Sequence, residues 1–237
     1  MKQTYIFICS YNRLGPLKDL VSCLLSRGYN NIVILDNQST YEPLLEWYTT
    51  LNNTGVVVYY CASNYGAGAL DFCKSQEAEF RDRYLDIINT QYHVYTDSDV
   101  VPINEIPDTF IDDMVYLANK YNIPKLGLSL KIDDLPDHFV FKQQVINHEG
   151  DFFQRGYIDD SICRIFKAPV DTTFAVNAPG MPCGLYGEAY RTGDLYFARH
   201  TPWYYDTKNL PDDEKYYYDH ITQISHWSNL IKQTINS

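Results

Sequence analysis

The chain has 237 residues, of which 45% are hydrophobic, so it is long enough to bury one substantial core but short for two full domains. Its formal charge of −11 and its isoelectric point near 4.8 argue against a nucleic-acid or anionic-membrane partner, because a protein that neutralises polymer phosphates normally carries an excess of Lys and Arg. We therefore expect one domain over residues 1–237 and no nucleic acid among its partners.

The sequence contains no run near the ~20 apolar residues that a membrane span requires, and the short apolar stretch after Thr4 does not match a signal peptide. We therefore expect no transmembrane segment and a cytoplasmic location. The six cysteines form no CxxC pair, and most lie in apolar segments where a reduced thiol behaves as a small hydrophobe. Their spacing indicates neither a zinc site nor a disulfide framework.

The first half of the chain alternates short apolar runs with helical patterns. The predicted strands are residues 5–9, 31–35, 56–60 and 93–96. Between the first two, apolar residues at helical spacing follow Pro16 and stop before Gly28, which suits a helix with one buried face. Such alternation implies right-handed crossovers and a parallel sheet, and therefore an α/β fold.

The second half has a weaker pattern. We predict a helix over 107–121, a strand over 126–130, an irregular excursion over 131–155, and short strands over 162–166, 172–176 and 195–198. A terminal helix is predicted after Pro211, with an apolar stripe at Ile221, Ile224, Trp227 and Ile231. Residues 1–101 thus form a half of the nucleotide-binding type, and residues 102–237 form a more irregular half.

Polar residues follow all four strands predicted in the first half. These segments are Ser10-Tyr11-Asn12-Arg13, Asp36-Asn37-Gln38-Ser39, the stretch 62–68 with Asn64 and Gly66, and Asp97-Ser98-Asp99. The loops at the carboxyl ends of strands in an open parallel sheet form its binding crevice, so we expect the four segments to share one site. Two carboxylates on one turn can hold Mg²⁺ or Mn²⁺ and leave positions open for two phosphates.

Together these motifs resemble the GT-A glycosyltransferases, close to the large family-2 group, in which an aromatic-containing loop follows strand one, an Asp follows strand two and a metal-binding Asp-x-Asp follows strand four. The resemblance implies a GT-A (Rossmann-like), mostly parallel central sheet flanked by helices, with an irregular acceptor-side C-terminal half. It further implies that Tyr11 stacks on the base, Asp36 accepts from the base's ring N–H, and Arg13 meets phosphate. The donor-binding residues expected on this basis are Ser10, Tyr11, Asn12, Arg13, Asp36, Asn37, Asn64, Gly66, Asp97, Ser98 and Asp99.

The segment Arg199 to Tyr204 resembles the His-containing segment that closes the donor site in many GT-A enzymes. We therefore expect His200 to be the third metal ligand beside Asp97 and Asp99, and its imidazole favours Mn²⁺ over Mg²⁺. Trp203 and Tyr204 are candidates for a platform that binds a sugar acceptor, and packing against the terminal helix is their alternative role.

An inverting transfer needs a carboxylate that takes the proton of the acceptor hydroxyl. Asp171, which precedes a predicted strand, is our first choice for this base, and capping of a turn is its alternative role. Asp159-Asp160, which resembles the paired acids of family-2 members, and Glu188 are the other candidates.

The expected function is a metal-dependent glycosyltransferase that uses Mn²⁺ or Mg²⁺ and a nucleotide-sugar donor, with UDP-sugar as first choice. Family analogy suggests a glycan or lipid-linked acceptor and work at the inner membrane face by peripheral association. A metal-dependent nucleotidyltransferase is an alternative, although Ser10 to Gly15 offers only Arg13 and one Gly as a phosphate loop. A phosphatase of the haloacid-dehalogenase type is a further alternative, but it would carry its Asp-x-Asp after the first strand, whereas Asp97-Ser98-Asp99 follows the fourth predicted strand. A non-catalytic sugar-nucleotide or glycan-binding module stays open.

Overall fold

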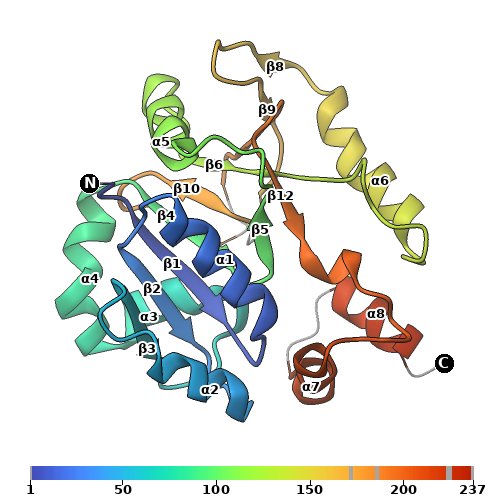
Figure 1. Ribbon diagram of the computed structural model, residues 1–237. Helices are drawn as coiled ribbons and strands as arrows, with labels where there is room; N and C mark the ends of the chain where they lie inside the picture. The colour runs from blue at the N-terminus through green and yellow to red at the C-terminus, as the bar shows by residue number, and fades with distance from the viewer. Residues whose placement is uncertain (1, 171–172, 185–186, 223–225, 236–237) are drawn as a thin grey trace.

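The computed structural model describes residues 2–170, 173–184, 187–222 and 226–235 (Figure 1). Its first half runs through the elements β1 (Tyr5–Ser10), α1 (Gly15–Ser26), β2 (Ile32–Asp36), α2 (Glu42–Thr49), β3 (Val56–Tyr60), η1 (Gly66–Gly68), α3 (Ala69–Gln76), α4 (Ala78–Thr90) and β4 (His93–Asp97). The four strands predicted for this half are confirmed, with bounds that differ by one residue at most.

The second half contains β5 (Val100–Pro102), α5 (Phe110–Lys120), β6 (Lys125–Gly127), β7 (Ser129–Leu130), α6 (Lys142–Gly150), η2 (Asp151–Gln154), β8 (Tyr157–Ile158), β9 (Ile165–Lys167), β10 (Ala175–Asn177), β11 (Tyr190–Thr192), β12 (Phe197–His200), η3 (Thr201–Tyr204), α7 (Asp212–His220) and α8 (His226–Ile235). None of the helices in the described part of the chain combines the length and apolar character of a membrane-spanning segment.

The central sheet has nine strands in the order β3-β2-β1-β4-β10-β6-β11-β9-β8. β3, β2, β1 and β4 pair in parallel, and among the nine strands β10 and β9 run against the rest. A second sheet joins β5, β12 and β7. The predicted α/β fold class, with a mostly parallel central sheet flanked by helices, is confirmed.

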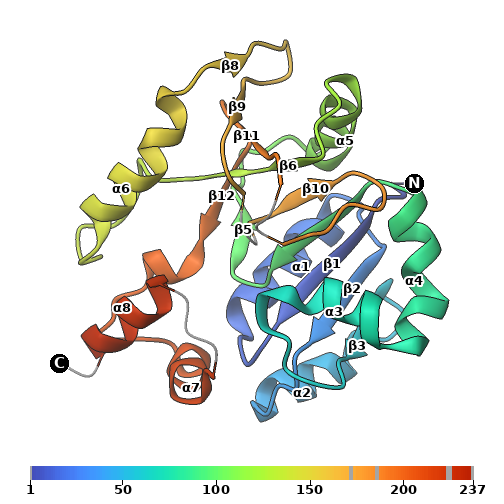
Figure 2. The same cartoon turned by 180° about the vertical axis from the view of Figure 1, so that it is seen from behind.

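Alternating side chains of the parallel strands feed two hydrophobic layers. Ile6 and Ile8 of β1 pack with α1 and α5 on one face, while Phe7 and Cys9 pack with α3 and α4 on the other. Figure 2 shows α3 and α4 over this second face. Because both faces are covered by helices, the polar residues at the strand ends are left at the edge of the sheet.

Three parts of the second half differ from the prediction. The run 126–130 is divided between β6 in the large sheet and β7 in the small one. The segment 131–155 carries α6, whose few buried side chains, Val145 and Glu149, leave little apolar periodicity to detect. The terminal helix is two helices, α7 and α8; Ile224 lies outside the described residues, as does the side chain of Trp227.

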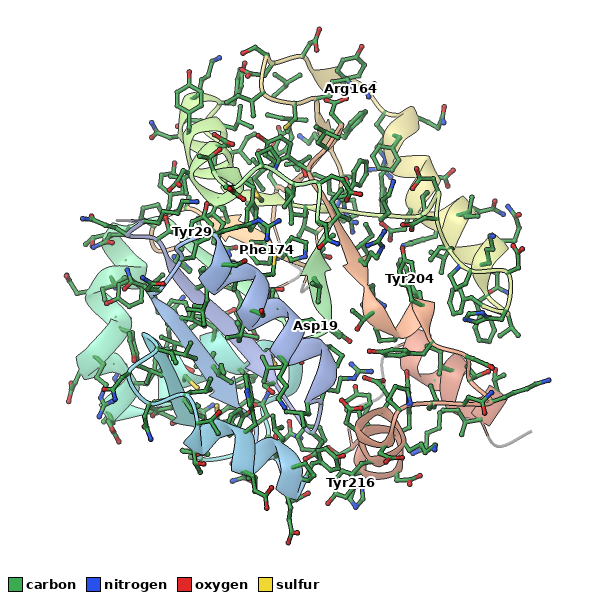
Figure 3. The ribbon with its side chains drawn as sticks, viewed as in Figure 1. Asp19, Tyr29, Arg164, Phe174, Tyr204 and Tyr216 are labelled. Atoms are coloured by element: carbon green, nitrogen blue, oxygen red, sulfur yellow. The ribbon has the colours of Figure 1, made fainter. Side chains whose placement is uncertain are left out.

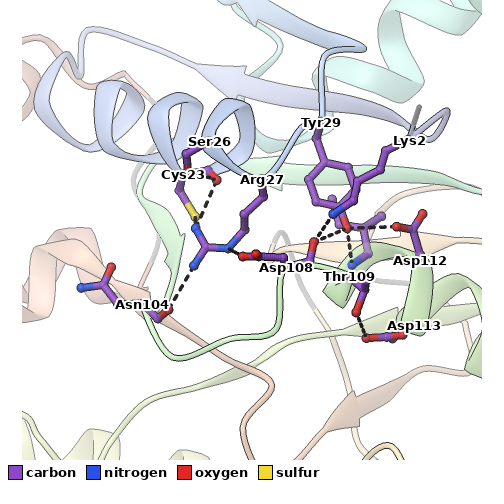
Figure 4. A network of polar contacts seen from close by, with 11 residues as sticks. Lys2, Cys23, Ser26, Arg27, Tyr29, Asn104, Asp108, Thr109, Asp112 and Asp113 are labelled. Atoms are coloured by element: carbon purple, nitrogen blue, oxygen red, sulfur yellow. Dashed lines mark hydrogen bonds and ion pairs between the residues drawn. The ribbon is translucent and has the colours of Figure 1, made fainter.

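A polar network ties the amino-terminal end of the sheet to the loop before α5 (Figure 4). The Tyr29 hydroxyl donates to the carbonyl of Asp108 and accepts from the backbone N–H of Ile111. Arg27 pairs with the Asp108 carboxylate and donates to the carbonyl of Asn104. The network lies at the end of the sheet opposite the predicted site, so we assign it a structural role.

Candidate functional site

The loop after β1 is locked to the loop after β2. Asn12 has a φ of 53°, a left-handed conformation that Asn tolerates better than most residues. Its buried Oδ1 accepts from the backbone N–H groups of Thr40 at 2.7 Å and Tyr41 at 3.0 Å, and its own N–H donates to Ser39 Oγ at 2.9 Å. The two strand-end segments predicted to share a site are therefore one hydrogen-bonded unit.

Asp36, the last residue of β2, is bonded to this unit and is only 1% exposed. Its Oδ1 accepts from the Ser39 N–H at 2.9 Å, and its Oδ2 accepts from the Tyr48 hydroxyl at 3.0 Å. Burial raises the pKa of the Asp36 carboxyl, and these hydrogen bonds oppose that shift. Its contact with a nucleotide base stays a prediction, because in this conformation Ser39 and Tyr48 donate to its two oxygens.

The loop after β3 joins the same edge through Asn37. The Asn37 Oδ1 accepts from the Tyr65 N–H at 3.1 Å, and its Nδ2 donates to the Gly66 carbonyl at 3.2 Å. Gly66 has a φ of 57°, and Asn64 Oδ1 accepts from its N–H at 3.0 Å. Three of the four predicted strand-end segments are thus in direct contact.

Arg13 connects these loops to the Asp-x-Asp turn after β4. Its guanidinium donates to Asp99 Oδ2, its Nε lies 2.9 Å from Glu214 Oε1, and its Cζ lies 3.6 Å from the centroid of the Tyr217 ring. The side chains of Asp99 and Glu214 are 5% and 0% exposed. Burial opposes ionisation of Asp99, but Arg13 and His200 outweigh it and hold the pKa of the Asp99 carboxyl well below its usual range.

His200 lies beside Asp99 as the sequence predicts. Its Nε2 is 3.5 Å from Asp99 Oδ2, and the Thr201 N–H donates to the Asp99 carbonyl at 2.9 Å, which fixes the start of η3 at this turn. Asp99 Oδ1 and His200 Nδ1 are buried and have no hydrogen-bond partner among the described residues. Ser98 is buried, and Asp97, at the end of β4, is partly exposed.

The predicted metal ligands fit a divalent cation in kind, since carboxylate and imidazole together suit Mn²⁺. The buried Asp99 Oδ1 is an acceptor without a partner, which is what a metal ligand needs. In the described part of the chain, however, the group of three possible metal ligands that lie close together is Cys61, Cys73 and Glu77, away from this turn. In addition, one Asp99 oxygen is paired with Arg13. Coordination by Asp97, Asp99 and His200 together stays a prediction, and it requires Asp97 to approach the other two.

Helix α7 covers this edge of the sheet, which the sequence did not predict. Asp213 Oδ2 accepts from the N–H groups of Leu14 at 3.0 Å and Gly15 at 2.7 Å, so it caps the start of α1. The Tyr11 hydroxyl donates to the His220 carbonyl at 2.9 Å. Tyr216, which lies toward α2 in Figure 3, packs on Tyr41 with ring centroids 5.0 Å apart.

The Glu214 carboxyl gives the fold a pH dependence that can be tested. Burial raises its pKa from 4.5 to about 7, against the opposing effect of Arg13. Because the folded-state pKa is the higher one, the stability that this group contributes is fully present below the unfolded pKa and is lost as the pH rises through 7. Gln cannot ionise, so the Glu214→Gln variant lacks this pH-dependent loss. We expect its free energy of unfolding, relative to that of the wild type, to be about 2 kcal/mol higher at about pH 8 than at about pH 5. Urea unfolding at both pH values measures this gain, and a constant difference between the two proteins contradicts it.

The predicted acceptor residues lie beside His200 but are engaged in packing. The Trp203 ring is 2% exposed and lies 4.7 Å from the His200 ring, so it does not form a surface platform for a sugar in this structure. Tyr204 is partly exposed, and its hydroxyl donates to Asp134 Oδ1 at 2.6 Å. Trp203 packs against the rings of His200 and Phe139, and its packing against the terminal helix, the alternative role, stays a prediction.

Among the base candidates, Asp171 lies outside the described residues, so its role stays a prediction. Asp160 is held by Lys120 and Tyr121, each 2.7 Å from its Oδ2. Glu188 pairs with Lys167 at the surface. Both of these carboxylates have structural partners, and the identity of the base stays a prediction.

No family model matches the chain, and no curated protein matches it. Among solved structures, it is similar to S. aureus TarS 1-349, with 12% identity and a TM-score of 0.45 over 99% of this chain and 71% of that one. The same fragment in complex with UDP-GlcNAc gives 10% identity and a TM-score of 0.46 over 99% and 72%. A cytidylyltransferase from Leptospira borgpetersenii gives 16% identity and a TM-score of 0.32 over 65% and 73%. These likenesses concern the fold alone.

Proposed function

We propose that the chain is a metal-dependent glycosyltransferase that moves a sugar from a nucleotide-diphosphate donor, with UDP-sugar as first choice, to a hydroxyl of a glycan or lipid-linked acceptor. The observation that carries the proposal is the junction of the strand-end loops, in which Arg13 reaches from the loop after β1 to Asp99 after β4. The loop after β1 is also bonded to the loop that follows Asp36. Residues proposed for the base and for the diphosphate therefore share one edge of the sheet.

The charge at this edge explains why a metal is part of the proposal. Asp36, Asp99, Asp213 and Glu214 lie at the edge as buried acids, and Arg13 is the cation that contacts two of them. A diphosphate placed there meets net negative charge, which a divalent cation would offset. Asp97, Asp99 and His200 would hold it, and a bound metal stabilises the negative charge that develops on the diphosphate as the sugar leaves.

Donor binding in this proposal requires α7 to move. Its Asp213 accepts from the N–H groups at the start of α1, which is a favourable position for a phosphate, and its Glu214 pairs with Arg13. Tyr11, proposed to stack on the base, is tied to the α7 carbonyl of His220. A diphosphate that reaches Arg13 replaces the two α7 carboxylates with its own oxygens, so the local charge balance is kept.

The transfer itself is proposed to invert the sugar's configuration, with Asp171 as the base that takes the acceptor's proton. The acceptor side is proposed to include Tyr204, whose ring lies next to the His200 segment and is partly exposed. Arg13, close to the leaving diphosphate, would complement the metal by donating hydrogen bonds to phosphate oxygens.

A donor screen by thermal shift tests this function. We expect UDP-sugars with Mn²⁺ to raise the melting temperature, and we expect EDTA to remove the shift, because a ligand that binds only the folded state stabilises it by mass action. GDP- and CMP-sugars are tested in the same way as comparison donors, to show whether the protein prefers UDP. A UDP-sugar shift that is the same in Mn²⁺ and EDTA contradicts the metal assignment, and no shift from any donor contradicts the proposed function. A shift without sugar transfer or hydrolysis favours a non-catalytic binding module.

A further inference from the structure

Two cysteines and a glutamate that are separated in the sequence meet behind the predicted donor loop. Cys61 directly follows β3, Cys73 lies in α3, and Glu77 is the residue after α3. Cys73 and Glu77 are four residues apart, so they lie on the same side of the helix end. Both cysteines are buried free thiols, whereas Glu77 is partly exposed.

The spacing of the three ligand atoms matches a tetrahedral zinc site. Cys61 Sγ lies 3.6 Å from Cys73 Sγ, Cys73 Sγ lies 3.7 Å from Glu77 Oε1, and the three ligand atoms lie within 4.8 Å of one another. Zn–S bonds near 2.3 Å and a Zn–O bond near 2.1 Å at tetrahedral angles place two sulfurs about 3.8 Å apart and a sulfur and an oxygen about 3.6 Å apart. The two distances that involve Cys73 therefore lie within about 0.2 Å of the tetrahedral values, and the Cys61 sulfur lies within 4.8 Å of the Glu77 oxygen.

The surroundings of Glu77 hold it in position for this role. Its Oε2 accepts from the Tyr59 hydroxyl at 2.6 Å, and its Oε1 accepts from the Ala62 N–H at 3.0 Å. Hydrogen bonds of this kind orient a metal-ligating carboxylate. Since Glu77 is partly exposed while the thiols are buried, an ion would enter from the Glu77 side, and water would fill the fourth position.

We propose that Cys61, Cys73 and Glu77 form a binding site for one Zn²⁺, separate from the proposed Asp97/Asp99 site. Binding converts both thiols to thiolates and releases two protons, with no change in oxidation state. Thiolates select Zn²⁺ over Mn²⁺, so the two sites would take different ions. The ion would tie the end of β3 to α3 and thereby stabilise the loop 62–68, which contains Asn64 and Gly66.

Cobalt(II) is the probe that tests this site, because bound thiolates give it a charge-transfer absorption in the near ultraviolet that oxygen ligands do not give. The chelator-treated, reduced full chain is titrated with Co²⁺ and then with Zn²⁺. We expect the band to saturate at one Co²⁺ per chain and to be displaced by Zn²⁺. We expect Cys61→Ser and Cys73→Ser to lose it, and Glu77→Gln to bind Co²⁺ at least about 10-fold more weakly.

The control is Cys23→Ser, which changes a partly exposed thiol outside the cluster and should leave the band intact. Asp99→Asn should also keep it, which separates this site from the proposed donor metal. If a serine variant does not fold, protection of Cys61 and Cys73 from alkylation by Zn²⁺ in the wild type, located by mass spectrometry, supports the site. The proposal is overturned if the wild type gives no thiolate band, if the band survives in both serine variants, or if the two thiols form a disulfide and bind no ion.

Discussion

Replacing Asp99 with Asn is expected to weaken Mn²⁺-dependent UDP binding by about 100-fold, because the cation that would offset the charge of the diphosphate loses one of its carboxylate ligands. The fold should persist. Arg13 keeps Glu214 as a partner at 2.9 Å. The substitution therefore leaves one buried acid beside one buried cation, in place of two acids beside it. Isothermal titration calorimetry of UDP, in Mn²⁺ and in EDTA, measures the loss.

The matched control for this variant is Asp194→Asn, which removes the carboxylate of a surface pair with Arg164 on another part of the molecule. It should bind UDP as the wild type does. In EDTA, Asp99→Asn should bind UDP no more weakly than the wild type, because neither has a metal to contribute and the variant has one acid fewer at this edge. If the wild type and Asp99→Asn bind UDP with equal affinity in Mn²⁺, the assignment of Asp99 as a metal ligand is wrong.

Replacing Arg13 with Met is expected to have the largest effect on stability, about 3–5 kcal/mol of destabilisation. The reason is that Asp99 and Glu214 are both buried and both depend on the same guanidinium. Without it, Asp99 and Glu214 lie together in a buried site with no cation beside them, so a proton must be taken up or a charge must be desolvated without an opposite charge to offset it. Urea unfolding near neutral pH measures the free energy of unfolding.

Two further variants separate this cause from a loss of packing. Arg13→Met combined with Glu214→Gln should recover part of the loss, since one of the two buried acids left without a cation is removed. Arg164→Met breaks a surface pair with Asp194 and should cost at most about 1 kcal/mol. A cost for Arg13→Met no larger than that of Arg164→Met would show that the buried network contributes little.

The parallel half of the fold was predictable from local pattern. Runs such as Tyr5 to Cys9 are apolar on both faces, as strands between two helical layers must be, and Pro16 and Gly28 bracket the helix that follows. Once the strands are known, the rule that carboxyl ends of parallel strands meet at one edge predicts that Asn12, Asp36 and Asp99 approach one another. The contact of Arg13 with Asp99 agrees with that expectation.

The parts that were missed depend on contacts between distant segments. Glu214 lies 201 residues after Arg13, and an acidic first turn such as Asp212-Asp213-Glu214 is equally typical of a solvated helix start. Cys61 and Cys73 are 12 residues apart on different elements, a spacing that matches no metal-binding motif. Trp203 was a candidate sugar platform because aromatic side chains suit both binding and packing, and its ring packs against Phe139 from another loop.

The most direct test of the central claim is the position of the metal in crystals grown with UDP and Mn²⁺, located by the anomalous scattering of manganese. The account predicts one Mn²⁺ bound to Asp99 and bridging the two phosphates, with the base beside Tyr11 and α7 displaced from Arg13. Manganese and UDP bound away from the loops after β1 and β4, or UDP bound there with Arg13 still between Asp99 and Glu214 and no metal, would contradict it.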